Sequence, residues 1–271
     1  MIVQSAAQNQ PNFVMTMAEH TELAAQFAAY FGNAEFASVE PQQEMLYVIR
    51  HHDAGWRELD AQALRDPATG LPYNLVQTPF ELIIKTSAAS PDFNSGQHPY
   101  CGLISSMHSW GLYNGRYGMS DKVLLDGLAD DNRVNADVML DLELERQQTL
   151  KDALTSNPET AAWIEEAHLL QNYKQLQFFD TLALYFNCVH ADAREPTTFS
   201  HVPVNSADDA DIRIEPEEEG SYVMSPYPFD SNEITFSYAG RYLEPVDTGN
   251  DVSASLQSAP PQSQSVRIKK G

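Results

Sequence analysis

The sequence predicts a mainly α fold, a helical bundle followed by a small C-terminal β appendage. Apolar residues recur at steps of three and four through most of residues 13–190, which is the period of helices with one buried face. After residue 190 the chain becomes polar, and two short segments alternate as strands do. The 271 residues, 42% of them hydrophobic, suffice for one large domain, or for one domain with a smaller appendage.

The first predicted helix runs from Thr16 to Phe31. Thr16 is suited to cap this helix, and Glu19 three residues later completes a capping box. Leu23 lies on the apolar face, and a step of three residues back from it reaches His20. His20 is therefore expected on the buried face, in the first turn.

A second helix is predicted after Pro41. Its buried stripe consists of Met45, Val48 and Ile49. The next position of this series is His52, so His52 rather than His51 is expected to point inward. Asp53 follows directly, which places a histidine and a carboxylate side by side at the helix end.

A third helix is predicted from Pro99, which suits a first-turn position, and carries His108 on one side. The loop that ends it contains Arg116. Residues 66–99 are rich in Pro, Gly, Asp and Ser, so we expect mainly loop there, with one short helical piece near 78–87.

Two further helices complete the predicted bundle. Residues 135–154 form an acidic helix, and the next helix begins near Pro158. The latter continues through Leu184 or breaks once near Asn172. Apolar residues at three- and four-residue steps surround Asp180, so a carboxylate is expected in the middle of a buried stripe.

The C-terminal third reads differently. Residues 190–220 are polar and acidic, residues 221–224 and 233–238 alternate like strands, and the Ser-, Gln- and Pro-rich residues after 247 are typical of disorder. The expected parts are a helical metal-binding domain at 13–190, an acidic linker with a small β appendage at 191–246, and a flexible tail at 247–271.

Charge and cysteine content limit the partners. The formal net charge is −22, so we expect no nucleic acid and no anionic membrane as a partner. No run of about 20 apolar residues predicts a membrane span, and Met1–Ser5 does not begin a signal peptide. The two cysteines, Cys101 and Cys188, form no CxxC motif. A cytoplasmic protein with a small-molecule substrate is expected, and a homodimer is left open.

Three histidines and two aspartates fall on or beside buried faces of four helices. They are His20, His52, Asp53, His108 and Asp180. A buried carboxylate is costly unless it is paired, hydrogen-bonded or bound to metal, and a divalent ion satisfies several such groups at once. Taken singly, each histidine fits a hydrogen-bonded core or boundary position better than a metal site, and Asp180 fits a helix-to-helix hydrogen bond as well as a metal bond. The set together predicts a metal site.

The order of these residues resembles the HD superfamily of metal-dependent phosphohydrolases, and more closely an uncharacterised bacterial domain-of-unknown-function family with an HD-like helical core. The matching segments are Glu19–Ala24, His52–Trp56, Ser105–His108 and Leu176–Leu184, with Pro226–Phe229 and Arg241 resembling C-terminal strands of that family. The resemblance implies that His20, His52, Asp53 and Asp180 bind one metal ion. It further implies that His108 completes this ligand set or holds a second ion. His98 and His51 are expected outside the ligand set.

The resulting expectation is a metal-dependent hydrolase, a phosphohydrolase acting on a small phosphorylated metabolite or nucleotide with metal-activated water as nucleophile. The expected cofactor is one or two divalent ions per chain, of manganese, iron, magnesium, nickel or zinc. Glu19 is the candidate base, and Arg116 the candidate clamp for a phosphate. Two alternatives are a di-iron oxygenase of the HD-like type and a non-catalytic protein that the metal only braces.

Overall fold

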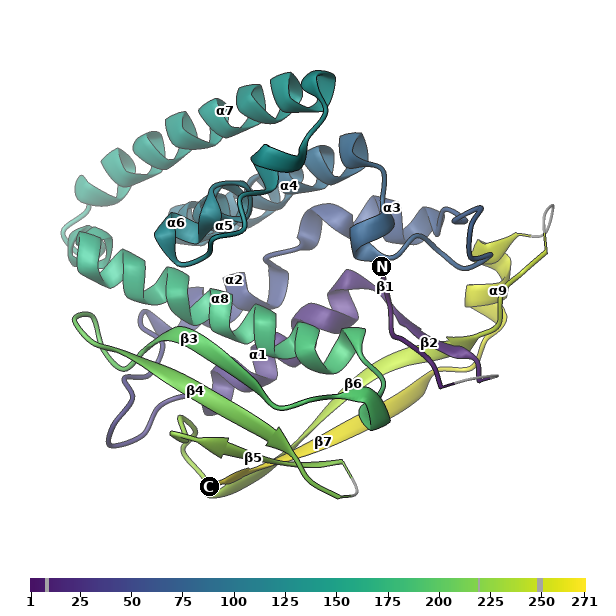
Figure 1. Cartoon of the computed structure of the whole chain (residues 1–271). Coiled ribbons are helices and arrows are strands. Elements are labelled where there is room, and N and C mark those ends of the chain that lie inside the picture. Colours follow the sequence, from purple (N-terminus) through teal and green to yellow (C-terminus); the bar gives the residue numbers. More distant parts are fainter. Residues whose placement is uncertain (8–9, 219, 248–250) are drawn as a thin grey trace.

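Helices pack against one face of a large β-sheet in the computed structural model of the protein, which describes residues 1–7, 10–218, 220–247 and 251–271 (Figure 1). The sheet has seven strands and is mixed. The fold is therefore α/β. The predicted mainly α fold, an HD-like bundle with a small β appendage, is wrong, and so is the all-α class that it implied.

The sheet draws its strands from both ends of the chain. They are β1 (Ile2–Val3), β2 (Asn12–Met15), β3 (Thr197–Pro203), β4 (Asp209–Pro216), β5 (Ser221–Ser225), β6 (Glu233–Leu243) and β7 (Gln262–Lys270). Their spatial order is β1-β2-β6-β7-β5-β4-β3. All neighbours are antiparallel except β5 and β7, which run parallel.

The helices form layers above this sheet (Figure 1). They are α1 (Met17–Tyr30), α2 (Gln42–His51), α3 (Arg57–Gln62), α4 (Phe80–Ser95), α5 (Pro99–Tyr113), α6 (Gly115–Gly118), α7 (Asp130–Thr155), α8 (Glu166–Cys188) and α9 (Val252–Ser258). Helices α1 and α8 contact each other and the sheet, whereas α4 and α7 pack on α5 farther out. No helix in the described part of the chain is long and apolar enough to cross a membrane.

The N-terminal helices follow the sequence pattern closely. Thr16 accepts a hydrogen bond from the Glu19 backbone N–H, and the Glu19 side chain accepts from the Thr16 backbone N–H, so the predicted capping box is confirmed. Phe27 of α1 packs edge-on against Phe236 of β6, with ring centroids 4.7 Å apart. This aromatic contact packs α1 against the sheet, and the opposite side of α1 faces α2.

Helix α4 is longer than the short piece predicted near 78–87. It extends to Ser95 and includes Pro91, which lacks the N–H that would bond the Ser87 carbonyl four residues earlier. That carbonyl instead accepts a hydrogen bond of 2.8 Å from the Ser109 hydroxyl on α5. A neighbouring helix thus supplies the missing donor, which a reading of one segment alone does not reveal.

The extent of the sheet was underestimated because three strands carry little apolar sequence. Strands β3 and β4 lie in the expected acidic linker, where β3 buries only its last two residues and β4 only Ile212 and Ile214. Strand β7 lies in the expected flexible tail, yet it pairs with strands on both sides and buries Val266 and Ile268. Each strand exposes one face, so two buried residues are enough to hold it in the sheet. Residues 248–250 of that expected tail lie outside the described residues.

Candidate metal centre

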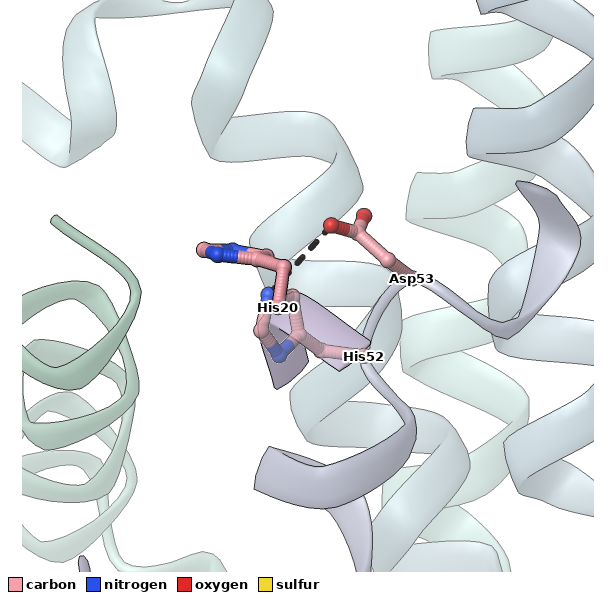
Figure 2. Close-up of side chains that lie close together, drawn as sticks. All are labelled: His20, His52 and Asp53. Atoms are coloured by element: carbon pink, nitrogen blue, oxygen red, sulfur yellow. Dashed lines mark ion pairs between the residues drawn. The ribbon is translucent and has the colours of Figure 1, made fainter. Parts of the chain in front are cut away.

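Four helical segments bring the five predicted side chains to one place in the interior. His20 comes from the first turn of α1, His52 and Asp53 from the end of α2, His108 from α5 and Asp180 from α8. Two groups with converging ligand atoms result, and they share His52: His20 with His52 and Asp53, and His52 with His108 and Asp180. Within each group all ligand atoms lie within 4.8 Å of one another. Figure 2 shows the first group, with a dashed line from the Asp53 carboxylate that marks its pair with His52.

The imidazole of His52 has one nitrogen engaged and one without a hydrogen-bond partner. Its Nδ1–H donates to the Ile49 carbonyl at 2.7 Å, within the helix end that carries it. Its Nε2 is buried without a hydrogen-bond partner among the described residues. Two carboxylate oxygens face this atom, Asp53 Oδ2 at 3.5 Å and Asp180 Oδ1 at 3.7 Å. Both distances exceed an ordinary hydrogen bond.

His20 repeats the same arrangement. Its Nδ1 lies 2.8 Å from Asn187 Oδ1, an acceptor, so the neutral tautomer with the proton on Nδ1 donates to Asn187. Its Nε2 lies 3.2 Å from Asp180 Oδ1. The carboxylate of Asp180 thus stands between two imidazoles, each of which has its Nδ1 held by an oxygen acceptor on the far side of the ring.

His108 completes the cluster from the α5 side. Its ring centroid lies 5.0 Å from that of His52, and its Nδ1 lies 2.5 Å from Gln177 Nε2 on α8. A carboxamide serves either neutral form of an imidazole, because it carries both a donor and an acceptor. Burial, together with the nearby charge of His52, lowers the pKa of His108 to about 3. His108 is therefore neutral at any ordinary pH, as a metal ligand must be.

The two carboxylates and His52 are strongly coupled. Burial alone lowers the pKa of His52, but Asp53 and Asp180 outweigh it and raise that pKa to about 9. Burial opposes ionisation of Asp180, yet its contacts with His20 and His52 hold its pKa well below the usual range. Burial raises the pKa of Asp53. Without a metal, a proton on His52 Nε2 is thus the positive charge that the carboxylates attract.

The spacing of the donors fits a single divalent ion. Donors that each lie about 2.0–2.2 Å from one ion are separated from each other by roughly 3–4 Å. The distances of 3.2, 3.5 and 3.7 Å between imidazole nitrogens and carboxylate oxygens fall in this range. Both groups share Nε2 of His52, because its Nδ1 is taken by Ile49, so an ion bound to this nitrogen would have the donors of both groups around it.

A comparison with protein families shows to which family the chain belongs. A family model matches residues 1–245, a range that includes all five side chains of the cluster. The chain belongs to the DUF3891 family. The family is described as a protein of unknown function. No curated protein and no solved structure matches this DUF3891 chain.

The other two predicted site residues of this DUF3891 protein lie outside the cluster. Glu19 binds the N-terminus of α1 through the capping box, and its Oε1 pairs with Arg241 of β6 at 2.9 Å. These contacts account for both of its carboxylate oxygens. Arg116 follows α5 and lines a separate hollow, together with the Gln177 side chain that contacts His108.

The remaining histidines considered from the sequence also lie apart from the five ligands. His51 is half-buried beside Tyr47 and Phe93, on the other side of the helix end from His52. His98 caps α5 by accepting a hydrogen bond from the Tyr100 backbone N–H. Neither belongs to a group with converging ligand atoms among the described residues.

Sequence reasoning missed Asn187 and Gln177, which hold two of the imidazoles. A signal for both was present, because Gln177 precedes Asp180 by three residues and Asn187 follows it by seven. These spacings place all three side chains on one face of α8. A polar residue in phase with a buried carboxylate is therefore a candidate partner for the histidines that the carboxylate meets.

A hollow begins directly after Asp53. It encloses about 660 Å³ and is lined by Ala54, Gly55, Arg57, Lys85 and Phe93, among others. Asp53 is the most exposed of the five ligands, with 14% of its side chain accessible. The backbone at Gly55 lies so close to α4 that a Cβ atom there would stand 2.1 Å from the Thr86 carbonyl oxygen. The glycine thus lets the segment that carries Asp53 approach α4.

Proposed function

We propose that this protein is a metal-dependent hydrolase that acts on a small phosphorylated molecule. His20, His52, Asp53, His108 and Asp180 would hold one divalent ion. The observation that carries the proposal is the unpartnered Nε2 of His52. In neutral His52 this atom presents a lone pair, because Nδ1 donates to Ile49, and that lone pair faces two carboxylates. Such an arrangement is repulsive unless a positive charge lies between the groups.

A divalent ion suits this cluster better than a proton does. A proton on Nε2 of His52 leaves the second imidazole, His20, with its own lone pair toward Asp180. One divalent ion accepts the lone pairs of both rings, and the two carboxylates balance its charge. Nitrogen and carboxylate oxygen donors in this combination suit manganese, iron, nickel and zinc.

The residues in and around the cluster have different roles in the proposed hydrolysis. Asn187 and the Ile49 carbonyl orient His20 and His52, and the buried position of these rings excludes water from the inner side. Asp53 marks the side that solvent reaches. When bound, a divalent ion lowers the pKa of a water ligand and polarises a phosphoryl oxygen, which is the chemistry that the hydrolysis of a phosphate ester needs.

The order of the ligands along the chain supports the hydrolase over the oxygenase. A histidine on the first helix, a His-Asp pair on the second and a late aspartate form the pattern of the HD superfamily of phosphohydrolases, and we extend that pattern to this chain. The di-iron alternative needs two ions, and Nε2 of His52, which both groups share, can bind only one of them. A purely structural ion would leave the protein without turnover, which the experiment below decides.

The test compares metal content and turnover in matched variants. We expect the protein as purified, or after addition of manganese, to hold one ion per chain by elemental analysis and to hydrolyse p-nitrophenyl phosphate. His52→Ala and Asp180→Asn should lose both properties, while His51→Ala, a change of the adjacent imidazole, should keep them. Unchanged metal content in both ligand variants would overturn the site. One bound ion without hydrolysis of any phosphate ester would leave the metal site and overturn the hydrolase.

A further inference from the structure

A second hollow lies beside the metal cluster and gathers positive side chains. It encloses about 250 Å³ between α8, the turn after α5 and strand β3. Arg116, Lys174 and His201 line it, with hydroxyl groups from Ser120, Thr181, Thr198 and Ser200. The chain carries 16 lysines and arginines against 38 acidic residues, so a pocket lined by cationic groups runs against the charge of the whole molecule.

Two of the basic side chains that line the pocket, Arg116 and His201, come from residues with a left-handed backbone. Among the described residues four non-glycine residues have a left-handed backbone, and three of them are Arg116 (φ 52°), Tyr117 (φ 56°) and His201 (φ 60°). Residues with a Cβ atom adopt this conformation at an energetic cost, and such residues concentrate at functional sites. His201 also lies where the register of β3 against β4 shifts, between Phe199 and Val202. Bulges of this kind redirect a side chain.

Arg116 retains an unneutralised charge in this pocket. The arginine ion pairs in the described part of the chain involve Arg50, Arg133, Arg146, Arg213 and Arg241. Arg116 is not among them. Asp209 lies nearest to the other two basic side chains, with its Oδ2 at 2.5 Å from Lys174 Nζ and 3.9 Å from His201 Nδ1. This one carboxylate balances the charge of Lys174, and the charge of Arg116 leaves the pocket with a positive balance.

The pocket is joined to the metal cluster by a single side chain. Gln177 lines the pocket and also contacts Nδ1 of His108. Thr181, which lines the same pocket, is the residue directly after Asp180 on α8. An anion bound in the pocket would therefore lie one side chain away from two of the proposed metal ligands.

We propose that this pocket binds a phosphate group, and that it is the phosphate site of the substrate of the neighbouring metal centre. That the bound phosphate belongs to a substrate rests on the proposed function, whereas the anion site itself rests on the pocket alone. Arg116 offers a planar fork of N–H donors that matches phosphate oxygens. The volume is smaller than the roughly 300–1,000 Å³ of pockets for drug-sized ligands, so it suits the charged end of a molecule rather than the whole of it.

Binding of inorganic phosphate to the full chain tests the proposal, by calorimetry in the presence of a chelator. We expect wild-type protein to bind one phosphate, and Arg116→Gln to bind it roughly tenfold more weakly or worse, because a charge-assisted hydrogen bond is lost. Arg57→Gln is the matched control, since Arg57 lines the larger hollow instead. Equal binding by wild type and Arg116→Gln would overturn the proposal, as would a loss of binding in Arg57→Gln alone.

The failure of this inference is distinguishable from that of the hydrolase. Metal content of Arg116→Gln should equal that of wild type, because Arg116 is not among the ligands. If the chain binds phosphate through Arg116 but takes up no metal, the anion site stands and the proposed function fails. If the chain binds metal and hydrolyses phosphate esters with an unchanged KM in Arg116→Gln, the metal centre stands and the anion site is wrong.

Discussion

The imidazoles at this site depend on the hydrogen-bond partners that orient them as much as on the carboxylates that they face. For His20 and His52 an oxygen acceptor takes the Nδ1–H, which directs the Nε2 lone pair toward Asp180. The ligand candidates were predictable from the sequence, because helical spacing places them on buried faces and the structure brings all five together. Their partners were not, since Asn187 acts across 167 positions of sequence and only the packing of α1 on α8 brings it to His20.

The first prediction concerns Asn187, which is fully buried behind His20. Asn187→Ala should weaken manganese binding by about 10- to 100-fold, because the imidazole loses the acceptor that fixes its tautomer and orientation. Asn187→Asp should retain binding within a few-fold, because a carboxylate accepts the same Nδ1–H. The measurement is metal titration by calorimetry at neutral pH. Equal affinities of wild type and Asn187→Ala would show that His20 needs no such support, and would weaken its case as a ligand.

At the scale of elements, α4 shows how one helix depends on another. Its proline leaves the Ser87 carbonyl without a helical donor, and Ser109 of α5 supplies one. Ser90 of the same helix accepts the Gly55 backbone N–H at 3.0 Å, which ties the segment after Asp53 to α4. Local signals predicted α1 and α2 well, because the capping box of α1 and the buried stripe of α2 each lie within one segment. They underestimated α4, because the group that compensates for Pro91 belongs to a different helix.

The second prediction tests this compensation. Ser109→Ala should lower the free energy of unfolding by about 1–3 kcal/mol, since the Ser87 carbonyl loses the hydroxyl that donates to it. The same substitution in a Pro91→Ala background should cost clearly less, because residue 91 then provides an N–H to Ser87. Urea denaturation of the four proteins measures the coupling. Equal costs in the two backgrounds would mean that the Ser109 hydroxyl does not substitute for the missing helical bond.

At the scale of the whole molecule, the extent of the sheet is the feature that the sequence did not predict. Strand β7 occupies an inner position between β5 and β6, although its segment contains only two buried apolar residues in a Ser- and Gln-rich context. The hydrophobic pattern of a segment reports how many of its own side chains are buried. A strand that exposes one face buries few of them. What holds β7 is pairing with Ile234 on one side and Tyr222 on the other, and such long-range pairing has no local signature.

The third prediction follows from this inner position. Ile268 is fully buried at the point where β7 meets both neighbours, so Ile268→Ala should cost about 2–5 kcal/mol of unfolding free energy. Helical and strand signals in circular dichroism should be lost together, because α1 and α8 pack on the sheet that β7 joins. Arg267→Ala, on the exposed face of the same strand, should change stability by no more than about 0.5 kcal/mol. If Ile268→Ala unfolds at the wild-type midpoint, the burial of Ile268 does not contribute to the stability of the sheet.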